Sequence, residues 1–145
     1  MAKQISILYL CTGNSCRSQM AEGWTRHLGS ELFDVYSAGI EAHGKNPRAI
    51  AVMADAGIDI SGQESTIVNN TMLENADIVV TVCGHADEQC PVLPPAVKKV
   101  HWPLTDPAKA SGSEEDIMQA FRETRDEVGR RVRDLVQRLS VETGT

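Results

Sequence analysis

The eight residues CTGNSCRS, at positions 11–18, constrain the fold most, because they join an apolar run directly to an amphipathic pattern. Residues 4–10 are mostly apolar, with β-branched and aromatic members, which predicts a strand. After the loop, apolar residues recur every four positions at Met20, Trp24 and Leu28, which predicts a helix that ends at Gly29. The segment therefore predicts a strand, a short loop and a helix N-terminus.

The rest of the chain repeats this alternation. Residues 33–38 predict a second strand, and Asn46-Pro47 predicts the start of a helix that runs to Ala56 and ends at Gly57. The apolar run IVVTVC, residues 78–83, is typical of a parallel strand covered on both faces, and residues 98–102 predict a short outer strand. Ser113 and Asp116 have capping-box spacing, and the apolar stripe after them predicts a long final helix.

Alternating strands and helices predict an α/β fold, a three-layer domain with a parallel, flavodoxin-like sheet. A length of 145 residues fits a single catalytic domain over residues 1–145. Ligands of such sheets bind beyond the carboxyl ends of the strands. Because Cys11, Cys83 and the Asp106 loop each follow a predicted strand, we expect them to meet at that edge.

Charge and hydropathy exclude several classes of protein. The formal net charge is −6, and no apolar run approaches the roughly 18 residues that span a bilayer. Nucleic-acid surfaces need clustered Lys and Arg, and the net charge of −6 with a pI near 5.1 argues against a general surface of that kind. The N-terminal stretch shows no export signal, and four cysteines then fit a reducing compartment. We expect a cytoplasmic monomer that binds neither nucleic acid nor membrane.

The loop itself has the properties of an oxyanion site. A short loop around a helix N-terminus points backbone N–H groups inward, and the helix dipole favours negative charge there. Gly13 and Asn14 can adopt the left-handed conformations that a tight loop requires, and Arg17 can hold two oxygens at once. The same field favours the thiolate form of Cys11, with Ser18 as a hydroxyl donor to the sulfur. The residues expected to bind the anion are Thr12, Gly13, Asn14, Ser15, Cys16 and Arg17.

Other segments add a family resemblance. The strand entering CTGNSCRSQMAE and the late Asp106-Pro107 are accompanied by YSAGIEAHGKNP, GIDISGQES, ADIVVTVCG, CPVLPP and HWPLTDPA. With these motifs the chain resembles the low-molecular-weight protein tyrosine phosphatase superfamily, and within it the thioredoxin-coupled arsenate reductases. The resemblance implies the low-molecular-weight phosphatase fold, an arsenate-binding loop, Cys11 as nucleophile and Asp106 as the acid that assists departure of oxygen. It also implies thioredoxin as the electron donor.

Two further cysteines bear on the choice of reaction. A phosphatase needs one nucleophilic cysteine, whereas reducing arsenate to arsenite takes two electrons, which a thiol pair supplies by closing a disulfide. In the simplest scheme Cys11 attacks arsenic, and Cys83 then attacks the Cys11 sulfur to release arsenite. Cys90 attacks Cys83 and carries the disulfide outward to a protein reductant. This scheme predicts a three-cysteine arsenate reductase that serves arsenic detoxification.

Alternatives remain for these residues. The chain is also compatible with a low-molecular-weight phosphatase whose Cys83 and Cys90 regulate Cys11 by reversible oxidation, or with a non-catalytic oxyanion sensor. Asp106-Pro107 is also compatible with a simple turn. The cysteine spacing lacks the CxxC pairs of structural zinc sites, so no metal site is expected. The histidines show no ligand pattern; they are His27, His43, His85 and His101.

Two departures from the family pattern affect the ligands expected. Some reductases of this family hold potassium under the loop, and the resemblance places Asn14, Glu22 and Ser37 at ligand positions. Thr66 stands where those proteins carry an Asp, which removes much of the attraction for a cation and weakens the case for potassium. Nothing in the sequence indicates a bound organic cofactor, and we expect none. Gln19 replaces a proline of many tyrosine phosphatases, and no tyrosine follows Asp106-Pro107, which weakens the case for a phosphotyrosine substrate.

Overall fold

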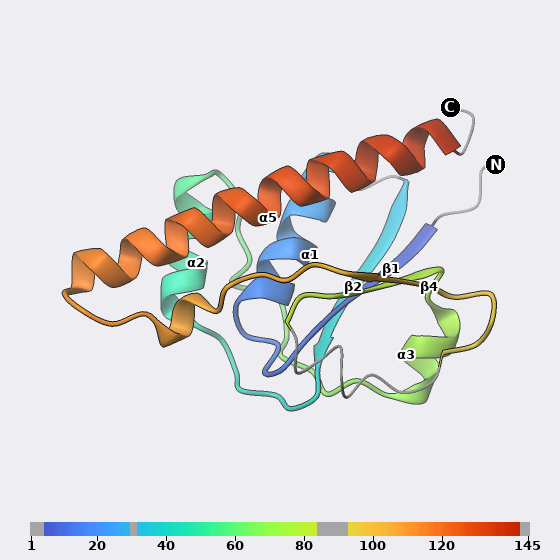
Figure 1. Cartoon of the computed structure of the whole chain (residues 1–145), viewed down its shortest axis with the longest axis horizontal. Coiled ribbons are helices and arrows are strands. Elements are labelled where there is room, and N and C mark those ends of the chain that lie inside the picture. The colour runs from blue at the N-terminus through green and yellow to red at the C-terminus, as the bar shows by residue number, and fades with distance from the viewer. Residues whose placement is uncertain (1–4, 30–31, 84–92, 143–145) are drawn as a thin grey trace.

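A computed structural model describes residues 5–29, 32–83 and 93–142 of the chain (Figure 1). Its strands are β1 (Ile5–Cys11), β2 (Phe33–Gly39), β3 (Ile78–Thr81) and β4 (Lys98–His101). Its helices are α1 (Arg17–Gly29), α2 (Pro47–Asp55), α3 (Asn70–Asn75), the 3-10 helix η1 (Pro107–Lys109) and α5 (Glu114–Glu142).

The strands form one parallel sheet in the order β2-β1-β3-β4. Helices α1, α2 and α5 lie together on one face, and α3 lies on the other (Figure 1). The predicted three-layer, flavodoxin-like α/β fold is confirmed. The connection after β1 leads outward to β2, whereas the connection after its neighbour β3 leads outward to β4 on the other side, so these two connections run in opposite directions. The crevice at such a switch point is where open α/β sheets bind their ligands.

Two helix starts follow the capping chemistry that the sequence predicts. The Asn46 side chain accepts hydrogen bonds from the backbone N–H groups of Arg48 and Ala49 at 3.0 and 3.1 Å, and Pro47 occupies the first turn of α2. Ser113 and Asp116 each accept a hydrogen bond from the other's backbone N–H at 3.1 Å. These caps fix where α2 and α5 begin.

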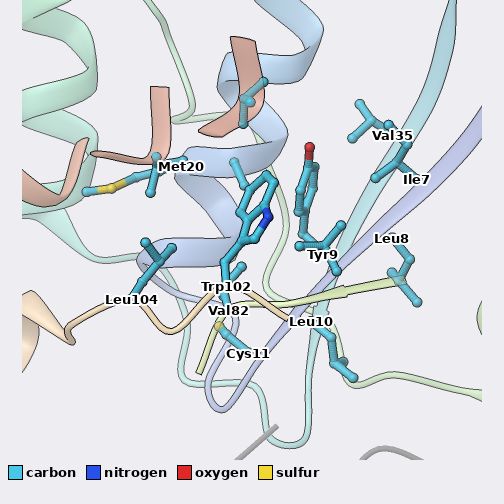
Figure 2. Packing of buried hydrophobic residues seen from close by; sticks show 14 of the residues in the cluster. Ile7, Leu8, Tyr9, Leu10, Cys11, Met20, Val35, Val82, Trp102 and Leu104 are labelled. Atoms are coloured by element: carbon cyan, nitrogen blue, oxygen red, sulfur yellow. The ribbon is translucent and has the colours of Figure 1, made fainter. Parts of the chain in front are cut away.

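The core lies between the sheet and helices α1 and α5 (Figure 2). Residues 7–10 of β1 are at most 1% exposed, because helices cover both faces of the strand. The rings of Tyr9 and Trp102 pack tilted, with centroids 5.8 Å apart. Figure 2 shows the Cys11 sulfur at the boundary of this cluster, where β1 passes into the loop. The packed core thus gives the loop a rigid base.

Candidate active site

A cavity of about 500 Å³ opens at the carboxyl edge of the sheet. The loop after β1, the segment after β3 and residues 105–109 after β4 all contribute to its walls. Cys11, Arg17, Cys83 and Asp106 line it together. The expected meeting of these side chains at one edge is confirmed, although they come from segments far apart in the sequence.

The Cys11 sulfur is surrounded by hydrogen-bond donors. It lies 2.9 Å from the Ser18 hydroxyl and accepts a hydrogen bond from the Asn14 backbone N–H at 3.2 Å. The Asn14 side-chain amide donates to the Ser18 oxygen at 2.8 Å, and the Ser18 hydroxyl hydrogen is free to donate to the sulfur. Both groups contact the sulfur directly, and Cys11 itself is buried.

The backbone of the loop follows the prediction at one position and departs from it at another. Asn14 has φ of 48°, the left-handed conformation expected of it. Gly13 is not among the described residues with positive φ, so the prediction of a left-handed Gly13 is wrong. Its missing side chain matters for a different reason, since a Cβ there would lie 2.1 Å from Nδ1 of His43.

Arg17 lies on the helical side of the cavity and is itself nearly buried. Its Nη1 donates to the Leu104 carbonyl at 3.1 Å, and its Nη2 lies 3.5 Å from the Asp106 carboxylate. Within the described ranges, its buried Nε has no hydrogen-bond partner. Leaving a buried N–H unpaired is costly, so this group is well suited to an oxygen of a bound oxyanion.

Asp106 combines the two alternatives that the sequence left open. One carboxylate oxygen accepts the Ala108 N–H at 3.0 Å and caps η1, as in a simple turn. The other faces Arg17, and the residue lines the cavity with Cys11. The turn therefore delivers the carboxylate to the cavity.

The second thiol of the cavity belongs to Cys83, which is buried two residues beyond β3. Its sulfur lies 3.2 Å from the Thr12 hydroxyl, so a residue of the anion loop contacts it directly. Cys90 lies outside the described residues, as do Gly84 and His85.

Cys16 also lines the cavity, and its chemistry differs from that of Cys11. Burial raises the pKa of its thiol to about 11, with the Asp106 and Cys11 charges acting in the same direction. At neutral pH it therefore remains a thiol. The sequence predicts Cys16 among the residues of the anion-binding loop, and it does line the cavity there.

Four lining residues were not predicted from the sequence: His43, Thr105, Ala108 and Lys109. The His43 backbone N–H donates to the Gly13 carbonyl at 2.8 Å, which holds the ring against the loop. No spacing signal marks such a contact, because it depends on how the segment after β2 folds over the loop. Lys109 belongs to η1, a single turn that has no periodic pattern.

The residues at the potassium positions already bind one another. The Glu22 carboxylate accepts hydrogen bonds from Ser37 at 2.6 Å and from Arg26 at 2.9 Å, and Asn14 Oδ1 accepts the Thr66 N–H at 2.7 Å. The Arg26 guanidinium supplies the positive charge that a cation would bring. This group does not fit potassium. The part of the chain that the structure describes contains no cluster of three or more metal-ligating side chains. It also contains no helix that could cross a membrane.

Comparisons with known proteins agree with this architecture. Residues 6–144 match the family model described as low molecular weight phosphotyrosine protein phosphatase. A protein named arsenate reductase from Bacillus licheniformis is 57% identical over 88% of this chain and 92% of its own length. An arsenate reductase from Bacillus subtilis is 53% identical over 90% and 94%. A solved structure titled as an arsenate reductase in the phosphate binding state has a TM-score of 0.76 and 36% identity, covering 93% of this chain and 98% of that one. The chain therefore belongs to the low molecular weight phosphotyrosine protein phosphatase family.

Proposed function

We propose that this chain is an arsenate reductase that acts in the cytoplasm in arsenic detoxification, as a single catalytic domain and a monomer. The observation that carries the proposal is the second buried thiol: Cys83 lines the same cavity as Cys11 and contacts the loop through Thr12. Hydrolysis of a phosphate ester has no use for this thiol, whereas a two-electron reduction needs it. The names of the two Bacillus relatives support the same substrate.

The first step forms a bond between sulfur and arsenic. Arsenate binds in the anion cradle, the loop of residues 12–17, where backbone N–H groups and Arg17 hold its oxygens. The Cys11 thiolate attacks arsenic, and one oxygen leaves as water after taking a proton from Asp106. Arsenic remains in its +5 state in this covalent adduct. Ser18 and the Asn14 N–H hold the thiolate in place before attack.

The second step is the reduction. The Cys83 thiolate attacks the Cys11 sulfur, so that an S–S bond forms and the S–As bond breaks. The electron pair of the broken bond goes to arsenic, which leaves as arsenite in the +3 state. The Thr12 hydroxyl, 3.2 Å from the Cys83 sulfur, is placed to donate a hydrogen bond to this thiolate.

The third step regenerates the nucleophile. The Cys90 thiolate attacks Cys83, which frees Cys11 and leaves a Cys83–Cys90 disulfide. The two thiols of reduced thioredoxin then reduce this disulfide and become oxidised in turn. Each turnover thus consumes one arsenate and one dithiol, and no bound cofactor takes part.

The test is arsenate-dependent oxidation of NADPH with thioredoxin and thioredoxin reductase. Wild-type protein should turn over, whereas Cys11→Ser, Cys83→Ser and Cys90→Ser should each lose turnover. Hydrolysis of an aryl phosphate is measured in parallel. Protein that ignores arsenate but hydrolyses the ester through Cys11 would be a phosphatase. Protein that binds arsenate tightly and transforms neither compound would be an oxyanion sensor.

A further inference from the structure

Gln19, the third residue of α1, is buried, and its side chain makes an unusually complete set of hydrogen bonds. Its Nε2 donates to the carbonyl oxygens of Asn14 and Glu64 at 3.0 and 2.8 Å. Its Oε1 accepts a hydrogen bond from the Gln63 amide at 2.7 Å. A reversed amide would put an oxygen against two carbonyl oxygens, so the network fixes the orientation of this amide.

The Asn14 carbonyl belongs to the peptide unit that also carries the Ser15 N–H. None of the described peptide bonds is cis, and in a trans unit the C=O and N–H groups point in opposite directions. Gln19 holds the carbonyl against its own side-chain amide, beside the Glu64 carbonyl, so the Ser15 N–H is directed away from that amide. Ser15 lines the cavity, whereas Asn14 is fully buried.

This peptide unit is in particular need of a restraint. Asn14 has φ of 48°, a conformation that residues other than glycine rarely adopt, and it persists where surrounding contacts determine it. Its side chain is held separately, because Oδ1 accepts the Thr66 N–H and Nδ2 donates to Ser18. The described contacts of the Asn14 carbonyl include only the one with Gln19.

We propose that Gln19 is a positioning residue that fixes the Asn14–Ser15 peptide with the Ser15 N–H directed at the bound oxyanion. It acts through the backbone and does not touch the anion. The proposal rests on the proposed function in taking the anion to be arsenate; its test uses sulfate, a tetrahedral dianion that undergoes no reaction. The proposal also explains why this position carries an amide, which a proline cannot replace.

The test compares anion affinity with the reactivity of Cys11. In Gln19→Met, which keeps the side-chain volume but has no donor, the sulfate dissociation constant should rise about tenfold. The rate at which neutral iodoacetamide alkylates Cys11 should stay within about twofold, because its donors, Ser18 and the Asn14 N–H, lie outside this peptide unit. Gln19→Glu loses at least one of the two donors and should change affinity in the same direction. Gln137→Met, on the exposed face of α5, is the matched control.

Three outcomes would contradict either this proposal or the proposed function. Folded Gln19 variants with wild-type sulfate affinity would overturn the proposal. So would a loss of affinity accompanied by an equal fall in Cys11 alkylation, since the whole loop would then have lost its structure. Thermal unfolding followed by circular dichroism identifies any variant that fails to fold. Wild-type protein that does not bind sulfate, phosphate or arsenate would instead contradict the proposed function.

Discussion

Ser18 is the side chain that contacts the nucleophilic sulfur of Cys11. Its hydroxyl accepts a hydrogen bond from the Asn14 side chain and lies 2.9 Å from that sulfur. A hydrogen bond to a charged group contributes about 1.5 to 3 kcal/mol, so Ser18→Ala should slow alkylation of Cys11 at pH 7 about tenfold or more. The rate is measured with iodoacetamide and mass spectrometry of the Cys11 peptide. Ser111→Ala, on the exposed loop before α5, should leave it unchanged. Equal rates in wild type and Ser18→Ala would contradict a thiolate held by Ser18.

Cys16 should react with alkylating reagents far more slowly than Cys11, although both residues lie in one loop. Burial raises its pKa to about 11, so it stays protonated through neutral pH in the folded protein. In the unfolded chain a cysteine ionises near pH 8.5, so this thiol reduces stability progressively as pH rises from about 8.5 to 11. Native protein at pH 7.5 should be alkylated at Cys11 well before Cys16, whereas protein in urea should be labelled at both. Equal native labelling would contradict the raised pKa of the Cys16 thiol, since both cysteines are equally buried.

At the scale of elements, η1 is a single turn that places Asp106 at the cavity. Asp106→Asn keeps a side-chain oxygen that can accept the Ala108 N–H, but its amide cannot supply a proton to the departing oxygen. Turnover should fall about a hundredfold or more, while sulfate affinity and the midpoint of thermal unfolding change little. Asp106→Ala should lose turnover and some stability together. Unchanged turnover in Asp106→Asn would leave this residue with its capping role alone.

The elements divide into those that the sequence predicts and those that it does not. Apolar periodicity and capping residues predict all four strands and the helices α1, α2 and α5. In these elements the weak structural preferences of many residues point to the same conformation. Helices α3 and η1 were not predicted. Each is short, and each begins at a side chain, Asn69 or Asp106, that accepts a backbone N–H. Elements this short contain no repeating apolar pattern that a sequence analysis could detect.

At the scale of the whole molecule, the topology could be predicted, but the details of the loop could not. The parallel sheet brings strand ends together whatever their sequence, so Cys11, Cys83 and Asp106 could be placed at one edge in advance. The contacts that shape the loop link distant positions. Thr66 bonds to Asn14 across 52 residues, and His43 packs on Gly13. Such contacts depend on the folded path of the segments after β2, which no local pattern encodes.

The relay requires a change in the whole molecule that can be tested on the wild-type chain. A disulfide needs Cα atoms about 4.4 to 6.8 Å apart, and the proposed relay pairs Cys83 first with Cys11 and then with Cys90, so we predict that the chain after β3 changes conformation between the two steps. Oxidation to the Cys83–Cys90 disulfide should also break the contact between Cys83 and Thr12. Oxidised and reduced protein should therefore differ in protease sensitivity within residues 83–95.

A protease specific for glutamate is suited to this test, because Glu88 lies between the two cysteines and residues 83–95 contain no Lys or Arg. We expect cleavage after Glu88 to be several times faster in oxidised protein, since bending or unwinding exposes backbone to the protease. Samples are reduced before mass spectrometry, because the disulfide would otherwise hold the two fragments together. Cys90→Ser, treated with the same oxidant, should keep the slow pattern. Identical digestion of oxidised and reduced wild type would mean that Cys83 does not leave the cavity, and the third step of the relay would be wrong.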